Sequence, residues 1–228
     1  MQTLAVIPAR GGSRGIPRKN LRLLGGVPLL VHTIRAAQQA KRVDRFVVST
    51  EDAEIAGVAR RAGAEVVERP DHLATDDAST VAVVHHAIDA LESSSGTRAD
   101  IVVTLQPTSP LRGADLIDQA VDLVANGAHR SAVTVAEIPF AAPTVGILSD
   151  ARFRASVTLT DPRRQVAPSA VRLTGAVYVT TRDLLDDGRL TDGAPAALLT
   201  QGAAAIDIDA PADLAAARRA LRRGSTYG

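Results

Sequence analysis

Short apolar runs alternate with segments of helical periodicity through most of this 228-residue chain. The runs contain few polar residues, which is typical of strands buried on both faces of a sheet. The segments between them place alanine, leucine, isoleucine and valine three and four residues apart, as in helices with one buried face. This alternation predicts an α/β fold, a three-layer sandwich in which helices cover both faces of a mostly parallel sheet.

The pattern also predicts where the elements lie. Residues 137–171 interrupt the alternation, because they are rich in proline and alanine and lack helical spacing. We interpret them as a small lobe inserted in a single domain that occupies residues 1–228. Residues 75–77 are expected to cap the helix that follows them. Strands are expected at 4–7, 45–50, 64–68, 100–105, 131–136, 172–180 and 203–208, and helices at 28–40, 52–62, 81–91, 113–124 and 211–222.

A basic, glycine-rich stretch follows the first apolar run; we call it the basic loop, residues 8–20. Its glycines let the backbone turn tightly and present N–H groups to a ligand, and its cations add positive charge. The spacing is neither that of a Walker P-loop nor the Gly-x-Gly-x-x-Gly fingerprint. The loop therefore predicts a polyphosphate site, the alternative being a solvated basic turn. The residues concerned are Gly11, Gly12, Gly15, Arg10, Arg14, Arg18 and Lys19.

Two further polar segments follow expected strands. In parallel α/β sheets, ligands bind beyond the carboxyl ends of the strands. Residues 49–52 and the QPTSPLR loop, residues 106–112, lie at such ends, as the basic loop does. This placement predicts one shared cleft, although QPTSPLR could equally be a stiff surface loop with a helix cap. Its polar side chains are Gln106, Thr108, Ser109 and Arg112.

Asp207 and Asp209 stand two residues apart in the sequence DIDAPADL. At the end of the strand expected at 203–208, both carboxylates would point to one face. Paired carboxylate oxygens suit Mg²⁺, which also takes water and phosphate oxygens. The alternative is a capping pair at a strand–helix junction.

Composition excludes several other functions. A net charge of +1 and 2% aromatic residues argue against a nucleic-acid partner. The absence of cysteine excludes disulfides, and the five scattered histidines do not indicate a zinc site. No apolar run is long enough to span a membrane, and the first residues do not form a signal peptide, so we expect a cytoplasmic protein without a membrane partner.

The sequence IPARGGSRGIPRKNL, with QPTSPLR and DIDAPADL further along, resembles the acylneuraminate cytidylyltransferases, the CMP-sialic acid synthetases. Members couple CTP to an acidic sugar and release pyrophosphate. The resemblance implies a nucleotide-diphospho-sugar transferase-like fold, Mg²⁺ as cofactor and a homodimer in which the lobe of one subunit reaches the sugar site of the other.

The resemblance also implies roles for particular residues. Arg10, Lys19 and Asp209 would be catalytic, and Asp207 and Asp209 would hold the metal. Nucleotide contacts would come from Arg10, Gly11, Gly12, Ser13, Arg14, Lys19, Asn20, Arg69, Ser79 and Thr80. Sugar contacts would come from Gln106, Thr108, Ser109, Arg163, Arg164, Gln165 and Tyr178.

The sugar side of the resemblance is less complete than the nucleotide side. Thr174-Gly175 stands where the family has Asn-Gly, and Val171 where an aromatic is often found. Residues 179–206 contain no aromatic, and no lysine follows Lys41. The sugar could therefore be an N-acylneuraminate or a related nonulosonate, a legionaminic-type sugar, a Kdo-like sugar or a phosphonate. A non-catalytic nucleotide-binding protein is the alternative from another class.

Overall fold

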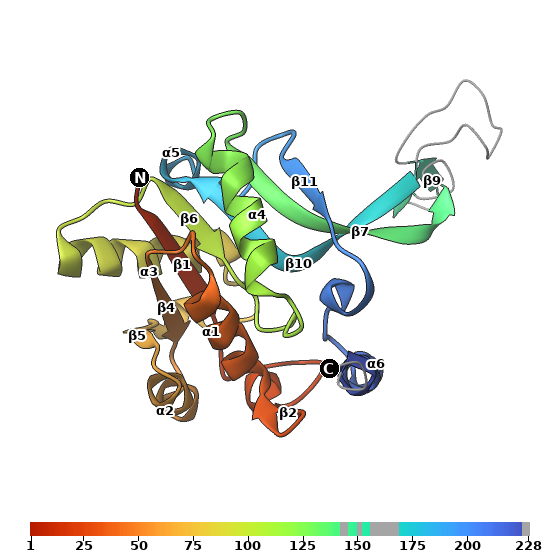
Figure 1. Cartoon of the computed structure of the whole chain (residues 1–228), viewed down its shortest axis with the longest axis horizontal. Coiled ribbons are helices and arrows are strands. Elements are labelled where there is room, and N and C mark those ends of the chain that lie inside the picture. The colour runs from red at the N-terminus through yellow and green to blue at the C-terminus, as the bar shows by residue number, and fades with distance from the viewer. Residues whose placement is uncertain (142–145, 150–151, 156–168, 225–228) are drawn as a thin grey trace.

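The computed structural model describes residues 1–141, 146–149, 152–155 and 169–224. Its central sheet has seven strands in the order β11-β7-β10-β6-β1-β4-β5 (Figure 1). Paired strands run parallel except at β10, which is antiparallel to β6 and β7. The predicted mostly parallel sheet is confirmed. Its strands are β1 (Thr3–Pro8), β4 (Arg45–Thr50), β5 (Glu65–Glu68), β6 (Ile101–Thr104), β7 (Ser131–Ala141), β10 (Ser169–Thr181) and β11 (Ala196–Leu199).

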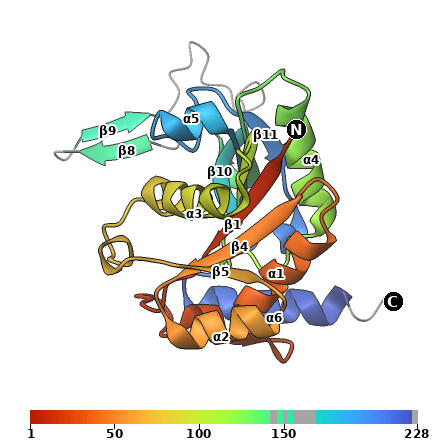
Figure 2. The same cartoon turned by 90° about the vertical axis from the view of Figure 1, so that its left-hand side faces the viewer.

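Helices cover both faces of the sheet (Figure 2). On β1, Ala5 and Ile7 belong to one core cluster and Leu4 and Val6 to another, as the two-residue period of a strand requires. Burying each large aliphatic side chain contributes about 1.5–3 kcal/mol. The helices that pack with the first cluster are α1 (Leu29–Gln39), α2 (Ala53–Arg61) and α4 (Ala114–Ala125); those with the second are α3 (Thr80–Ser95) and α5 (Arg182–Asp186).

A third, smaller core joins the two ends of the chain. Helix α6 (Pro211–Gly224) packs with the hairpin of β2 (Leu23–Leu24) and β3 (Val27–Pro28). Ile16 of the basic loop, Ile208 and Leu214 are buried together in this cluster. The C-terminal segment is thereby held beside the basic loop, which the sequence pattern alone did not indicate.

Strands β7 and β10 continue beyond the other strands, and a hairpin of β8 (Gly146–Ser149) and β9 (Arg152–Ala155) lies near their far ends (Figure 1). Much of the described part of 137–171 is therefore β-structure, where the sequence pattern showed no regular element. Proline and alanine weaken the apolar alternation on which a strand prediction depends. The division of the chain into one domain with an inserted lobe remains an expectation.

One strand prediction in the C-terminal half is wrong. The strand expected at 203–208 is a 3₁₀ turn, η5 (Gly202–Ala205), followed by chain that has no sheet partner among the described residues. The guanidinium of Arg172 donates to the carbonyl of Ala205 at 2.8 Å and holds this turn. The sheet instead gains β11, and α5 follows β10; the sequence pattern predicted neither.

The capping prediction for α3 is also wrong. Ser79 is the N-cap residue of that helix, with no side-chain hydrogen bond to the cap. Residues 75–77 lie in the preceding loop, after the 3₁₀ turn η2 (Asp71–Leu73), and Asp76 is engaged by arginines of the basic loop. Within the described part of the chain, no helix is long and apolar enough to cross a membrane.

Candidate active site

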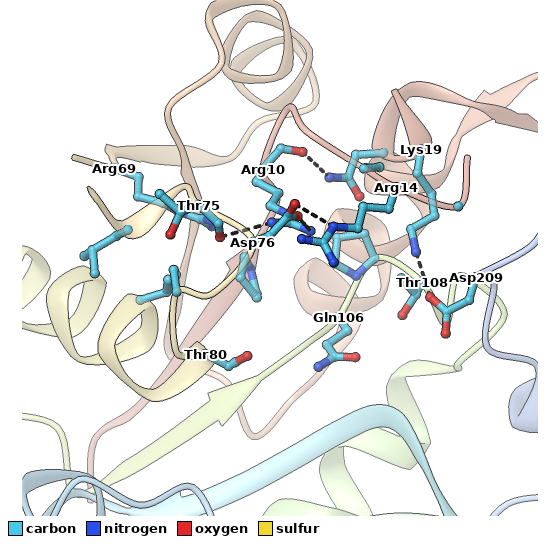
Figure 3. A pocket seen from close by; sticks show the side chains of 18 residues that line it. Arg10, Arg14, Lys19, Arg69, Thr75, Asp76, Thr80, Gln106, Thr108 and Asp209 are labelled. Atoms are coloured by element: carbon cyan, nitrogen blue, oxygen red, sulfur yellow. Dashed lines mark hydrogen bonds and ion pairs between the residues drawn. The ribbon is translucent and has the colours of Figure 1, made fainter. Parts of the chain in front are cut away.

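A cavity of about 490 Å³ opens at the carboxyl ends of β1 and β6, where the parallel sheet predicts a ligand site. The basic loop, the loop at residues 69–80, the QPTSPLR loop and Asp209 supply its lining (Figure 3). Three of these four segments follow strands of the parallel sheet, and the fourth precedes α6. The basic loop and the QPTSPLR loop meet in this cavity as predicted, whereas residues 49–52, the third segment of the predicted cleft, do not line it.

Two arginines of the basic loop share one carboxylate. Asp76 lies 2.7 Å from Nη2 of Arg10 and 2.6 Å from Nε of Arg14 (Figure 3). Arg10 also donates through Nη1 to the carbonyl of Thr75, at 3.1 Å. The hydrogen bond from Arg14, followed by that from Arg10, holds the pKa of Asp76 below its usual value. Asp76 thus occupies with a carboxylate the position where an anionic ligand would meet both guanidinium groups.

Arg69 is a third cation of the cavity, and it is buried. Its guanidinium donates to the backbone carbonyl of Ser49 at 2.7 Å and to the hydroxyl of Ser49 at 3.2 Å. Burial lowers the pKa of Arg69, and the nearby carboxylate of Glu51 opposes this shift. A guanidinium fixed by the neighbouring strand β4 offers a rigid donor, which suits recognition of one ligand group better than general charge attraction.

Lys19 begins the 3₁₀ turn η1 (Lys19–Leu21) and extends toward the far wall of the cavity. Its Nζ atom lies 2.8 Å from Oδ1 of Asp209. The next residue, Asn20, is buried, and its side-chain amide donates to the backbone carbonyl of Arg10 at 2.9 Å. This bond ties the two ends of the basic loop together, so that Arg10 and Lys19 face one space.

Asp207 and Asp209, the two acids of the DID segment (residues 207–209), differ in their environment. Asp207 is half-buried, and its Oδ1 atom has no hydrogen-bond partner, whereas Asp209 is exposed. Burial, and then the charge of Asp209, raises the pKa of Asp207. The backbone N–H of Ile208 between them donates to the carbonyl of Thr108 at 2.7 Å and anchors the segment to the QPTSPLR loop.

These two acids fit a divalent cation. An unpartnered buried carboxylate oxygen is costly, and a bound cation would relieve the cost. The described residues hold no group of three or more acidic or histidine side chains suited to a metal. Mg²⁺ favours a coordination shell in which two carboxylates bind it and water and phosphate oxygens fill the remaining positions. Because the predicted strand is absent, a loop bond to Thr108, and not strand geometry, presents these carboxylates.

The QPTSPLR loop contributes some of its predicted contacts and not others. Gln106 and Thr108 line the cavity. Ser109 does not, since it is buried and its hydroxyl donates to the carbonyl of Thr174 at 3.2 Å. Arg112 is also buried and donates to the carbonyl of Gln106, and burial lowers the pKa of Arg112 to about 9. These two residues stabilise the loop from behind.

Most predicted site residues meet in the cavity. Gly11 does not line it, and its N–H donates to Glu51 Oε1 at 2.7 Å, so this amide is not directed at a ligand. The contact with Asp76 was missed, because the sequence offered it only as a helix cap. The predicted site residues that line the cavity are Arg10, Ser13, Arg14, Lys19, Asn20, Arg69, Thr80, Gln106, Thr108 and Asp209. Those that do not line it are Gly11, Gly12, Ser79, Ser109, Tyr178 and Asp207. The remaining predicted residues, Arg163, Arg164 and Gln165, lie outside the described residues.

Comparison with known proteins gives consistent matches. Residues 4–144 match the sequence model of the family described as Cytidylyltransferase. The CMP-N,N'-diacetyllegionaminic acid synthase of Legionella pneumophila is 47% identical over 126 residues, which cover 54% of this chain and 53% of that protein. N-acylneuraminate cytidylyltransferase A of Danio rerio is 29% identical over 98% of this chain and 52% of its own length. The matched part thus spans about half the length of each of these relatives.

A solved structure gives the same fold. CMP:2-keto-3-deoxy-manno-octonic acid synthetase, solved in complex with CTP, superposes with a TM-score of 0.72 at 19% sequence identity. The superposition covers 98% of this chain and 100% of that one. The predicted nucleotide-diphospho-sugar transferase-like architecture is confirmed by this similarity, which at such low identity concerns the fold alone.

Proposed function

The chain belongs to the cytidylyltransferase family, and we propose that it transfers CMP from CTP to an acidic sugar of the nonulosonate class, releasing pyrophosphate. One observation carries the proposal: Arg10, Arg14, Lys19 and Arg69 line a single cavity together with the carboxylate of Asp209. Four cations around one cavity suit a polyphosphate, and a carboxylate among them suits the metal that accompanies it. A binding-only protein would need the cations but not the paired acids of the DID segment.

Arg10, Arg14 and Lys19 would hold the β- and γ-phosphates, because the basic loop presents all three side chains to the cavity. Arg69 and Thr80 line the other part of the cavity and would contact the cytidine. Gln106 and Thr108 would contact the sugar acid. A hydroxyl of that acid attacks the α-phosphorus and releases its proton to solvent, the bond to the bridging oxygen breaks, and pyrophosphate leaves with its charge held by the three cations.

Asp207 and Asp209 would hold Mg²⁺, which when bound would supply Lewis-acid chemistry for the transfer. The side chains around it align the reactants and stabilise charge on the leaving group, which is most of what phosphoryl-type transfer requires. Tyr178 is kept protonated, since burial and the charge of Asp207 raise its pKa. As a neutral phenol, Tyr178 would therefore donate a hydrogen bond and would not accept the proton that the attacking hydroxyl loses.

The choice of sugar acid depends on the sugar side of the site. The relatives' names include a legionaminic acid and an N-acylneuraminate. Thr174 is buried and bonds to Thr134 at 2.8 Å, so it does not replace the amide of the family's Asn-Gly as a sugar contact. With fewer apolar walls for an N-acyl group, we expect weak preference for N-acetylneuraminate and better use of another nonulosonate.

The test measures pyrophosphate release from CTP with each of several acids in turn. The panel contains N-acetylneuraminate, its deaminated analogue, legionaminate-type acids, Kdo and a phosphonate, with Mg²⁺ or EDTA. We expect release that needs an acid, prefers CTP over ATP and is lost in Asp209→Ala and in EDTA. No release with any acid, together with tight CTP binding, would favour the binding-only alternative. A preference for N-acetylneuraminate above about 100-fold would show that the departures on the sugar side are neutral.

The proposal includes a cytoplasmic homodimer in which the lobe, through Arg163 or Arg164, completes the sugar site of the other subunit. Exposed apolar side chains on β10 and β11 support an interface there: Val171, Leu173 and Leu199. Leu173 keeps 54% of its surface exposed, and exposed apolar patches mark protein–protein interfaces more than single exposed residues do. Light scattering should give a dimer, and Leu173→Glu should give a monomer with reduced activity. A fully active monomeric wild type would refute the dimer.

A further inference from the structure

Arg18 adopts a left-handed backbone conformation near the C-terminal end of the basic loop. Its φ is 55° and its ψ 37°, and within the described part of the chain it is the one residue other than glycine with positive φ. Such a conformation is unfavourable for a residue with a Cβ and persists where surrounding contacts impose it. Arg18 immediately precedes Lys19, so the turn at Arg18 sets the direction in which Lys19 leaves the backbone.

The side chain of Arg18 points away from the cavity, in contrast to its neighbours in the basic loop. Its guanidinium donates to both carboxylate oxygens of Asp52, with Nη2 at 3.0 Å from Oδ1, and to Glu54 Oε2 at 2.5 Å. Arg18 is not among the residues that line the cavity. An arginine that the sequence placed among phosphate-binding cations is therefore already saturated by carboxylates.

The carboxylate that receives Arg18 is itself fixed. Asp52 caps α2, accepting from the backbone N–H of Ile55 at 2.9 Å, and its own N–H donates to Thr50 Oγ1 at 3.2 Å. The hydrogen bond from Arg18 lowers the pKa of Asp52, so the carboxylate is ionised at neutral pH. Arg18 is thus attached to the end of β4 and the first turn of α2, which are rigid parts of the fold.

The same acidic turn, residues 51–54, fixes the other end of the basic loop. Gly11 donates its N–H to Glu51 Oε1 at 2.7 Å, and a Cβ at Gly11 would lie only 2.5 Å from Asp52 Oδ2. Because the loop rests on this turn at Gly11 and at Arg18, the turn controls its shape. Lys19 and Asn20 follow directly, one reaching Asp209 and the other the carbonyl of Arg10.

We propose that Arg18 is a positioning residue: its clamp on Asp52 and Glu54 sustains the left-handed turn that directs Lys19 into the cavity. The inference rests on the proposed function, since Lys19 matters here as a cation for the phosphates of CTP. Arg18 itself touches no substrate. Its effect on the reaction passes through the geometry of Lys19, and a shift of about 1 Å in such a group is enough to reduce a rate substantially.

The first experiment compares Arg18→Ala with a matched control. Arg45 on β4 forms an equally direct pair with Glu65, at 2.7 and 2.6 Å, remote from the cavity lining. We expect Arg18→Ala to lower kcat/KM for CTP about 10- to 100-fold while KM for the sugar acid is unchanged. Arg45→Ala should lose comparable thermal stability and keep wild-type kinetics. Equal kinetics in the two variants would overturn the proposal.

The second experiment asks whether Arg18 acts through Lys19. In a Lys19→Ala background, Arg18→Ala should cause no further loss of kcat/KM for CTP, because the residue that it positions is gone. A further loss of the same factor would mean that Arg18 contacts the phosphates directly, and would overturn the proposal. Arg18→Gly should retain more activity than Arg18→Ala, since glycine adopts the left-handed conformation without strain. Equal loss in both would contradict a role for the backbone turn.

Asp52→Asn provides an independent route if Arg18→Ala fails to fold. Asparagine keeps the helix cap but removes the charge that Arg18 requires. We expect a several-fold loss of kcat/KM for CTP, which also disappears in the Lys19→Ala background; unchanged kinetics would again overturn the proposal. Failure of the proposed function is distinguishable, because the wild type itself would then release no pyrophosphate from CTP with any acid.

Discussion

Nζ of Lys19 lies 2.8 Å from Oδ1 of Asp209, although the two residues are 190 positions apart in the chain. The lysine side chain is only 15% exposed, and the carboxylate is 73% exposed. The contact therefore closes one side of the cavity with a cation from the first loop and an anion from the last. A triphosphate that enters with a metal ion would find a partner of opposite charge for each of its components.

We predict that Lys19→Ala weakens the use of CTP. Loss of one charge-assisted contact to phosphate costs about 1–3 kcal/mol, which corresponds to roughly a 5- to 150-fold fall in kcat/KM. Lys41, the other lysine of the sequence, does not line the cavity and provides the control. Steady-state kinetics of Lys19→Ala and Lys41→Ala check this. Equal kinetics in both would remove Lys19 from the site.

We predict that Asp76→Asn tightens the binding of polyphosphates. Asp76 occupies Arg10 and Arg14, so an incoming anion must displace it or share the guanidinium groups. Calorimetry with pyrophosphate or CTP should show affinity raised several-fold relative to wild type. Asp77, the adjacent acid, forms no hydrogen bond or ion pair with the described residues, and Asp77→Asn should show wild-type affinity. Weaker binding by Asp76→Asn would mean that Asp76 holds the arginines in their binding geometry.

We predict that Gly175→Ala disturbs the sugar side of the site. Gly175 has φ +71°, and a Cβ there would lie 2.6 Å from Gln106 Oε1. Gly127 has φ +79° with no atom near its Cβ position, so Gly127→Ala carries the backbone strain without the clash. Both variants should lose about 1 kcal/mol of unfolding free energy. Only Gly175→Ala should raise KM for the sugar acid; an unchanged KM would show that Gln106 does not contact it.

We predict that Arg182→Met destabilises the fold in a pH-dependent way. Arg182, only 8% exposed, lies 2.9 Å from Asp89 and 3.0 Å from Glu92, and it also pairs with Asp186. Burial alone would raise the pKa of Glu92, but hydrogen bonds from Arg182 and Ala99 lower it overall. Removing the arginine leaves buried carboxylate charge unpaired, which we expect to cost about 3 kcal/mol at pH 7.

The sign of the pH effect follows from Glu92. Its lowered pKa gives stability that is present above the pKa of the unfolded chain and is lost as pH falls through the folded value. In Arg182→Met, burial instead favours the protonated acid. The difference between wild type and variant, measured by urea unfolding, should therefore shrink between about pH 6 and pH 4. Arg98→Ala, which removes a more exposed partner of Asp186, should cost under about 1 kcal/mol.

The sequence by itself determined the alternation of strands and helices, because the two- and near-four-residue periods of buried side chains are local properties of the chain. It placed β4 at Arg45–Thr50 and located the basic loop and QPTSPLR at one end of the sheet. It failed where small residues carry no clear period, as in the strand expected at 203–208, and for β7, whose far end lies in a proline- and alanine-rich segment.

Only the tertiary structure decided which polar side chains face the cavity. Arg14 and Arg18 have the same chemistry four residues apart, yet one lines the site with Asp76 and the other is held outside it by Asp52. Ser109 is buried against Thr174, and a bond between Ile208 and Thr108 presents Asp209. The position of each of these side chains depends on a partner that is distant in the sequence. The spacing of residues along a chain does not indicate where such partners lie.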